Sequence, residues 1–575
     1  MQFVAYSSAF SAPKLLAMPF QNTLFYGDNL TIMRDRIPSQ SVDLIYLDPP
    51  FKSDQNYNLI YKTLTGKPVP EQAEAFCDTW DMDAEKAEMA KRIPQMMRET
   101  GVPDYYIHFW TLWVNTLTDV QPHLLAYLIY MVERLIWMRP ILKDTGSIYL
   151  HCDPTASHYI KVMMDGIFGH KNFRNEIVWK RTFAHGSAKG WGDVHDTILL
   201  YSKTDKFRWN RILQAHDPDY VNDKYRFTDA RGRYRLVVLT GPGLVKAGPS
   251  SQPWRGINPS DGGRHWSVPQ RALAALRDEG VSIPTELHKQ LDLLVEHGFI
   301  RFPKKRGGGV GVPEFKLYLP KGQAIQDVIT DIPPLNSQAK ERLGYPTQKP
   351  KQLLKRIIEA SSNPGDVIFD PFCGCGTTIY ATQETGTRTW IGCDVAILAI
   401  KIIRETLSER YRLSEDRDFE VDGIPNSVEA AIELFQRDAH QFQHWAVERV
   451  GGFPMKKRGA DRGIDGRMYF EAKPGLRSMV MSVKGGHTGP ADVRDLYGVL
   501  EGDSDAELGG FICLHEPTKA MHAAASKAGR YEYNGTSYDR IQILSVREIL
   551  EEKREFRTPS KIGSRISTGQ VALPI

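Results

Sequence analysis

The stretch Leu47-Asp48-Pro49-Pro50-Phe51 follows an apolar run, Val42 to Leu47, that predicts a buried β-strand. Two prolines end this strand and stiffen the backbone, so that one carboxylate, one carbonyl and one aromatic ring stand at its carboxyl end. Open α/β sheets bind their ligands at this end. A base swung out of a duplex could stack on Phe51 and donate its amino group to Asp48 and to the Pro49 carbonyl. A simple turn in which Asp48 caps a helix would have the same residues.

Length and charge set the first limits on the chain. Its 575 residues exceed what one hydrophobic core supports, so three or four modules are expected. The apolar and charged fractions, 41% and 25%, are those of ordinary globular proteins. A formal charge of +4 permits binding to nucleic acid without requiring it, so any basic surface has to be local.

Six cysteines are too few and too scattered for a disulfide framework, which favours a reducing, cytoplasmic location. Cys373 and Cys375 could begin a zinc site, but no second Cys or His pair stands at zinc spacing. No uninterrupted apolar run is long enough to cross a bilayer, so no membrane partner is expected. Residues 1–20 are interrupted by Pro13 and are expected to form a loose tail.

Predicted strands and helices alternate through the first part of the chain, as they do in α/β folds. Thr23–Tyr26 and residues 146–151 are predicted strands, and Asp28 stands where the first strand ends and a helix begins. Asp28 is therefore an N-cap or a hydrogen-bond acceptor for a ligand, and the two roles are compatible. His151 and Asp153 end another strand, where a structural histidine is the more common case.

The composition changes between residues 204 and 340, where Gly, Pro, Trp and Arg replace long helical patterns. This change predicts an inserted module. Cations and aromatics alternate around Trp254, around Trp266 and in the run from Arg301 to Arg306. Such alternation suits phosphate contact and base stacking, although a solvated basic hairpin over residues 304–321 would have the same pattern.

A second strand, turn and helix follow at residues 367–378. Gly374 and Gly376 would let a ligand approach the backbone of the turn, and the start of the helix would offer N–H groups to a carboxylate. The next predicted strand ends in Asp394, about as far downstream as ribose-binding acids stand in nucleoside folds. A Gly-x-Gly turn alone is a weak signal, and the acid strengthens it.

The chain has the Asp48–Phe51 element first and the turn with Gly374 and Gly376 later. With its elements in this order, it resembles the β class of amino DNA methyltransferases over about residues 22–412. In that family an Asp-Pro-Pro-Tyr/Phe element comes first, a target-recognition region follows, and a Phe-x-Gly-x-Gly turn comes last. The resemblance implies an α/β, Rossmann-like, S-adenosylmethionine-dependent methyltransferase with an inserted target-recognition region, acting on double-stranded DNA. An initial Asp resembles the adenine-modifying members, so adenine is the expected target, with cytosine-N4 modification as the alternative.

The resemblance also assigns site residues by position. Asp48, Pro49, Pro50 and Phe51 correspond to the catalytic element. Asp28 would lie at the adenine end of the cofactor, and Asp394 would hold the ribose hydroxyls. The remaining cofactor candidates lie in two segments, and they are Thr347, Lys349, Asp370, Phe372, Gly374, Gly376 and Thr377. Methyl transfer of this kind needs no metal, because the positive charge on sulfur already activates the leaving group.

Beyond Arg412 the sequence is unlike a methyltransferase. Residues 422–427 predict a hinge, and residues 428–447 predict one amphipathic helix. The following segment resembles Mrr-type restriction endonuclease domains of the PD-(D/E)XK group, with the turn Gly463-Ile464-Asp465-Gly466 and a strand pair that turns at Lys473-Pro474-Gly475. The resemblance implies a second, α/β nuclease-like domain fused to the first.

In that domain Asp465 corresponds to a Mg²⁺ ligand and Lys484 to the catalytic lysine, with Glu448 a further ligand. Ser482 stands at the third ligand position, where the family has Glu or Gln, and a hydroxyl is a poorer ligand for a hard cation. Residues 471–473 form a competing Glu-x-Lys motif at the hairpin turn. An active nuclease and a nuclease-like fold kept for DNA binding or docking are both compatible with this pattern.

Together the patterns divide the chain into an N-terminal tail (1–20), a methyltransferase catalytic part (21–203), a target-recognition region (204–340), a cofactor-binding part (341–415), a linker and helix (416–440), an Mrr-like nuclease domain (441–556) and a disordered tail (557–575). We therefore expect DNA modification and restriction on one chain, and a homodimer by resemblance. The rival functions are a nuclease-led effector whose methyltransferase half reads sequence, and a DNA-binding protein with both sites degenerate.

Overall fold

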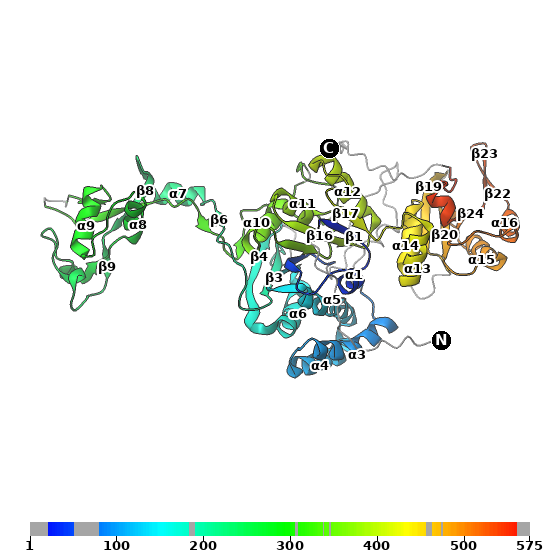
Figure 1. The fold of residues 1–575 in the computed structure, drawn as a ribbon, viewed down its shortest axis with the longest axis horizontal. Helices are drawn as coiled ribbons and strands as arrows, with labels where there is room; N and C mark the ends of the chain where they lie inside the picture. Colours follow the sequence, from blue (N-terminus) through cyan, green and yellow to red (C-terminus); the bar gives the residue numbers. More distant parts are fainter. Residues whose placement is uncertain are drawn as a thin grey trace. The chain divides into compact units, whose positions relative to one another are not determined.

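The computed structural model of the chain describes residues 21–50, 80–182, 190–304, 309–336, 338–343, 345, 347–455, 463–472 and 475–559 (Figure 1). Residues 211–326 form one compact unit, and the rest of the chain forms the other. The smaller unit falls inside the insertion predicted at 204–340. The predicted tail at 1–20 lies outside the described residues.

A nine-stranded sheet forms the centre of the larger unit, in the order β14-β4-β5-β3-β2-β15-β16-β1-β17. Neighbouring strands pair in parallel along the part of the sheet formed by β3, β2, β15, β16, β1 and β17. Strand β5 is antiparallel to both of its neighbours, β3 and β4. The strands are β1 (Thr23–Tyr26), β2 (Val42–Leu47), β3 (Leu142–Cys152), β4 (Phe173–Lys180), β5 (His195–Ser202), β14 (Val328–Ile329), β15 (Val367–Asp370), β16 (Thr389–Asp394) and β17 (Glu420–Asp422).

Strand β2 lies at the centre of the sheet, and all six of its residues are buried. Ile45 and Leu47 belong to the core on one face, whereas Leu44 and Tyr46 belong to the core on the other face. A parallel strand covered on both faces has to be apolar nearly throughout. The predicted strand over residues 42–47 is therefore confirmed.

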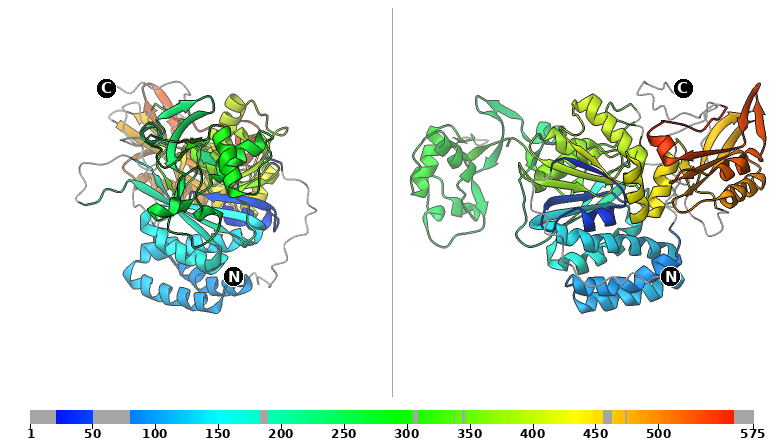
Figure 2. Two further views of the ribbon diagram at one scale, coloured as in Figure 1. Left: turned by 90° about the vertical axis from the view of Figure 1, so that its left-hand side faces the viewer. Right: turned by 45° about the vertical axis from the view of Figure 1, so that its right-hand side comes forward.

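Helices cover both faces of the sheet (Figure 1). Helices α1, α5 and α6 pack on one face and α10, α11 and α12 on the other, while the blue pair α3 and α4 forms an outer layer beyond α5 (Figure 2). Within the described part of the chain, no helix is both long and apolar enough to span a membrane. The helices are α1 (Asn29–Asp35), α3 (Ala84–Glu99), α4 (Asp104–Val120), α5 (Pro122–Ile141), α6 (Pro154–Met164), α10 (Lys351–Ser361), α11 (Thr377–Glu384) and α12 (Ile397–Tyr411).

The smaller unit has a core of its own, built around two tryptophans. Trp254 and Trp266 are 4% and 2% exposed, and their ring centroids lie 5.5 Å apart. The prediction that these rings stack on bases is therefore wrong, because burial in this core leaves no ring face open. The unit contains α7 (Pro218–Lys224), α8 (Gln270–Asp278), α9 (Leu287–Glu296), the sheet β11-β12-β8-β7 and two strand pairs, with strands β6 (Leu213–Gln214), β7 (Phe227–Asp229), β8 (Gly232–Val238), β9 (Thr240–Pro242), β10 (Arg264–Trp266), β11 (Ile300–Arg301), β12 (Glu314–Tyr318) and β13 (Gln323–Ala324).

The segment after α12 begins inside the large sheet. Asp422, predicted to open a hinge, instead ends β17, which pairs with β1. The single helix predicted over residues 428–447 is two helices, α13 (Val428–Arg437) and α14 (Ala439–Arg449). Asp438 separates them, because its backbone is extended and its carboxylate accepts the N–H groups of the next turn.

A five-stranded sheet, β18-β19-β20-β21-β24, follows α14. The predicted strand pair is confirmed as the antiparallel hairpin of β19 and β20. Arg557, predicted to begin a disordered tail, exchanges two hydrogen bonds with Gln542 of β24, and residues 560–575 lie outside the description. The elements are β18 (Phe453–Pro454), β19 (Gly466–Ala472), β20 (Gly475–Lys484), α15 (Pro490–Glu501), β21 (Ala506–Cys513), α16 (Lys519–Ser526), β22 (Arg530–Tyr533), β23 (Thr536–Asp539), β24 (Ile541–Ser545) and α17 (Val546–Leu550).

Candidate active site

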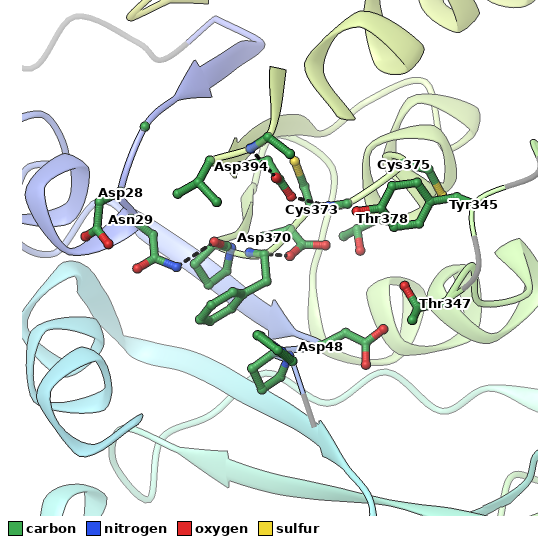
Figure 3. A pocket seen from close by; sticks show the side chains of 18 of the residues that line it. Asp28, Asn29, Asp48, Tyr345, Thr347, Asp370, Cys373, Cys375, Thr378 and Asp394 are labelled. Carbon is green, nitrogen blue, oxygen red and sulfur yellow. Dashed lines mark hydrogen bonds between the residues drawn. The ribbon is translucent and has the colours of Figure 1, made fainter. Parts of the chain in front are cut away.

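Four neighbouring strands of the large sheet, β2, β15, β16 and β1, end at one cavity of about 710 Å³ (Figure 3). The turn after each strand contributes lining residues: Gly27, Asp28, Asp48, Pro49, Pro50, Pro371, Phe372, Gly374, Asp394 and Val395. A volume of this size suits a cofactor or a nucleoside. The Asp48 element and the glycine turn, both predicted at strand ends, therefore line one cavity.

Asp48 leaves the carboxyl end of β2 and faces the cavity (Figure 3). Its Oδ2 atom accepts a hydrogen bond of 2.5 Å from Lys349 Nζ, and the two side chains are only 17% and 11% exposed. Lys349, predicted to contact the cofactor, therefore contacts the proposed catalytic carboxylate. Thr347 also lines the cavity, whereas Phe51 lies outside the described residues.

The glycine turn between β15 and α11 adopts a conformation that favours glycine at two positions. Gly374 has φ +49° and Gly376 has φ +88°. A Cβ atom on Gly376 would lie 2.8 Å from the Ile403 side chain, so a larger residue would meet both strain and a clash. Gly374 N donates a 2.9 Å hydrogen bond to Asp394 Oδ2, which joins this turn to the end of β16.

Two carboxylates beside this turn have raised pKa values. Burial raises the pKa of Asp370 to about 7, although its Oδ1 accepts a 3.0 Å hydrogen bond from Phe372 N. Burial likewise raises the pKa of Asp394 to about 6, although the Gly374 and Ala396 amides donate to its two oxygens. Both groups therefore titrate close to neutral pH, as residues in ligand sites often do.

Asp28, at the opposite end of the cavity from Thr347 in Figure 3, belongs to a polar network around the buried Arg134 side chain. Its Oδ1 accepts from Leu30 N at 2.7 Å, which confirms the predicted N-cap, and its Oδ2 accepts from Arg134 Nη2 at 2.6 Å. Arg134 also donates to Asn29, and Asn29 donates to the Pro371 carbonyl at 2.8 Å. The network therefore ties the turn after β1 to the turn after β15.

Arg134 and Asn29 were not predicted as site residues from the sequence. The available signal was the Glu-Arg pair in the middle of the largely apolar helix α5, where a charge is costly unless it is paired. Two further unpredicted residues are Tyr345, which stands beside Gly374, and Tyr130, whose ring centroid lies 6.2 Å from that of Phe372.

His151 is fully buried. Its Nδ1 lies 2.8 Å from the Tyr46 hydroxyl and its Nε2 lies 3.1 Å from Asp196 Oδ2. Tyr46 itself lines the cavity two residues before Asp48. His151 thus supports the strand that carries Asp48, in line with the structural interpretation of this histidine.

Of the candidate nuclease residues, Ser482 and Lys484 lie on β20, and Asp465 directly precedes β19. Asp465 Oδ2 accepts a 2.7 Å hydrogen bond from Val483 N, which sets its carboxylate between the backbone positions of Ser482 and Lys484. Glu448 is not part of this group: Tyr26 Oη and Ile397 N each donate to its carboxylate at 3.4 Å, so we withdraw it as a metal ligand. In the described part of the chain, no group of three or more His, Cys, Asp or Glu side chains could hold a metal ion.

The fold and the cavity define the protein as an α/β, Rossmann-like chain with a carboxylate and a glycine turn at adjacent strand ends. The protein-family model described as DNA methylase, of the N6/N4 methyltransferase type, matches residues 42–405, which is more than half of the chain. The chain belongs to this family of N6/N4 DNA methylases.

Three curated relatives illustrate the similarity. The Type II methyltransferase M.EcaI from Enterobacter cloacae is 32% identical over 322 residues, covering 55% of this chain and 65% of the relative. The Type III restriction-modification enzyme StyLTI Mod subunit from Salmonella typhimurium is 25% identical over 397 residues, covering 65% and 52%. The Type II methyltransferase M1.MboII from Moraxella bovis is 48% identical over 257 residues, covering 44% and 69%. The chain thus spans between half and two thirds of the first two relatives.

Proposed function

We propose that the chain is a site-specific methyltransferase that moves a methyl group from S-adenosylmethionine to the exocyclic amino group of adenine in double-stranded DNA. One observation carries the proposal: Asp48 and the Gly374 turn follow neighbouring parallel strands, β2 and β15, and line the same cavity. The names of the relatives, two Type II methyltransferases and a modification subunit, support the same class of activity.

The chemistry of the cavity lining fits S-adenosylmethionine. The first turn of α11, next to the positive-φ turn at Gly374, presents N–H groups suited to the carboxylate of an amino acid. Asp394 is an acceptor suited to ribose hydroxyls at the end of β16. Pro371 and Phe372 give the cavity an apolar wall suited to a purine face.

When bound, S-adenosylmethionine supplies a methyl group whose bond to sulfur breaks, with the electron pair staying on sulfur, as the bond to the amine nitrogen forms. Asp48 and the Pro49 carbonyl accept the two amine hydrogens of a flipped base and direct the nitrogen lone pair outward. Asp48 is also placed to take up the proton that the nitrogen loses. Lys349 holds the Asp48 carboxylate in place for both tasks.

Mass analysis of nucleosides from DNA incubated with the full chain and methyl-labelled cofactor tests the proposal. Labelled N6-methyladenine is expected. Labelled N4-methylcytosine would contradict adenine as the target and support the cytosine alternative. Absence of label in both bases would support a nuclease-led effector or a DNA-binding protein instead. The variant Asp48→Ala is expected to abolish transfer while the dissociation constant of the cofactor stays within about tenfold, because Asp48 faces the base and not the glycine turn.

We propose in addition that the domain after α14 is an Mrr-like endonuclease domain. The position of the Asp465 carboxylate beside Val483 N, one residue from Lys484, supports this role. Ser482 offers Mg²⁺ a weak ligand, so cleavage is expected to be slow. Nicking of plasmid DNA that needs Mg²⁺ and ends in the double variant Asp465→Ala, Lys484→Ala would support the proposal, and unchanged nicking would move the site elsewhere. A homodimer and a cytoplasmic location stay predictions.

A further inference from the structure

The first turns of α14 reach the candidate cofactor cavity, although this helix lies beyond the segment that the DNA methylase family covers. Three of its residues, His440, Gln441 and His444, line the cavity together with its N-cap Asp438. Gln441 Nε2 donates a 3.3 Å hydrogen bond to the Tyr26 carbonyl, at the end of β1. The helix therefore forms a wall of the cavity beside Gly27.

Packing fixes this position of α14. Glu448, one turn further along the helix, accepts hydrogen bonds from the Tyr26 hydroxyl and from Ile397 N, and burial raises its pKa to about 8. Phe442 and Trp445 belong to a core cluster that also contains Leu24 of β1. Neither contact depends on a ligand, so the wall is present before any ligand binds.

The same core cluster reaches the candidate nuclease hairpin. It contains Met481 and Val483 of β20, together with Trp445 of α14. Lys484 follows Val483 directly, and Val483 N is the group that binds the Asp465 carboxylate. One packed helix therefore touches the cofactor cavity on one side and the strand of the candidate nuclease site on the other.

The side chains on this wall are suited to a nucleoside. The His440 and His444 rings lie 4.5 Å apart by their centroids and offer planar surfaces, and the Asp438 carboxylate and the Gln441 amide offer acceptors and a donor. The neighbouring lining residues are Gly27, which precedes Asp28 at the predicted adenine end, and Asp394, which is assigned to the ribose.

We propose that α14 contacts the nucleoside end of the methyl donor, so that cofactor binding and the docking of the C-terminal domain are coupled. The inference rests on the proposed methyltransferase function. Because coupling is reciprocal, a cofactor that gains contacts from α14 also stabilises α14 and the β20 strand packed against it.

Calorimetric titration of the full chain with S-adenosylmethionine, and with methylthioadenosine as a probe of the nucleoside end alone, tests the contact. The double variant His440→Ala, His444→Ala is expected to raise both dissociation constants about tenfold. The single variant His440→Ala, at an exposed position that tolerates truncation, is expected to raise them about threefold. Arg449→Ala, an exposed change on the same helix outside the cavity lining, is expected to leave both unchanged.

Hydrogen exchange of the wild-type chain supplies the second readout. The cofactor is expected to slow amide exchange in residues 438–449 and in β20. If the wild type binds cofactor but the histidine variants bind it equally well and exchange in α14 does not change, the coupling is overturned while the methyltransferase proposal stands. If the wild type binds no S-adenosylmethionine, both the coupling and the methyltransferase proposal are contradicted.

Discussion

Lys349 Nζ lies 2.5 Å from Asp48 Oδ2, and more than four fifths of each side chain is buried. The two residues are 301 positions apart in the sequence, on the segment before α10 and at the end of β2. A cation at this position neutralises the carboxylate that we propose as the acceptor for the target amine, and it fixes the direction in which that carboxylate points. Lys349 is therefore a positioning residue for Asp48.

Removing this cation tests that role. The variant Lys349→Gln is expected to lower kcat about 10- to 100-fold, because Asp48 loses its charged partner and its fixed orientation. The dissociation constant of the cofactor is expected to change less than threefold. Single-turnover methylation together with calorimetry separates the two quantities. Weaker cofactor binding with a normal kcat in this variant would instead support the prediction from the sequence that Lys349 contacts the cofactor.

Asp394 predicts a pH dependence of cofactor binding. Its pKa is raised to about 6 by burial, so the carboxylate is ionised above that pH and gains a proton below it. Ribose hydroxyls donate to the ionised form, and binding is therefore expected to be about fourfold weaker at pH 5.5 than at pH 7.5. Calorimetry at both pH values measures the ratio. In Asp394→Asn the affinity should be low and this fourfold ratio should vanish; a ratio that persists would place the titrating group elsewhere.

Gly376 and Gly365 form a matched pair, because both have φ near +87° but only one is crowded. Gly365 has open space at its Cβ position, whereas a Cβ on Gly376 would lie within about 3 Å of Ile403 and Tyr380. Gly365→Ala is expected to cost about 1 kcal/mol of unfolding free energy, and Gly376→Ala about 2–4 kcal/mol. Urea denaturation measures both. Equal costs would show that backbone strain alone selects glycine at position 376.

Arg134 is expected to stabilise the site through the turns that it joins. The variant Arg134→Met keeps the apolar stem but leaves Asp28 and Asn29 without their buried partner. A loss of about 3–5 kcal/mol in unfolding free energy is expected, together with weaker cofactor binding. The matched surface change Arg34→Met on α1 should cost little, since the ion pair of Arg34 with Asp35 is solvent-exposed. A similar loss in both variants would contradict this assignment.

The strand ends were predictable from local sequence. The apolar run into Asp48, the run into Asp370 and the N-cap at Asp28 are short-range signals, and the structure has a strand or a cap at each of them. The glycine turn is equally local, because positive φ values at Gly374 and Gly376 are determined within a few residues.

Long-range packing overruled several local patterns. Trp254 and Trp266 stand among cations in the sequence, yet a core assembled from distant strands and helices covers both rings. Glu448 stands near the candidate nuclease residues in the sequence, yet its helix turns it toward Tyr26. Periodicity continued through Asp438, but the extended backbone at that residue ends one helix and starts the next.

The sequence by itself determined the α/β class, the order of the catalytic and cofactor elements, and the turns at which they stand. Apolar runs and glycine turns are local signals that a few consecutive residues carry. Tertiary structure alone decided which charge faces which. The pairing of Lys349 with Asp48, the Arg134 network and the α14 wall each join residues more than a hundred positions apart. Such contacts follow from how helices pack on a sheet, and no local pattern encodes that packing.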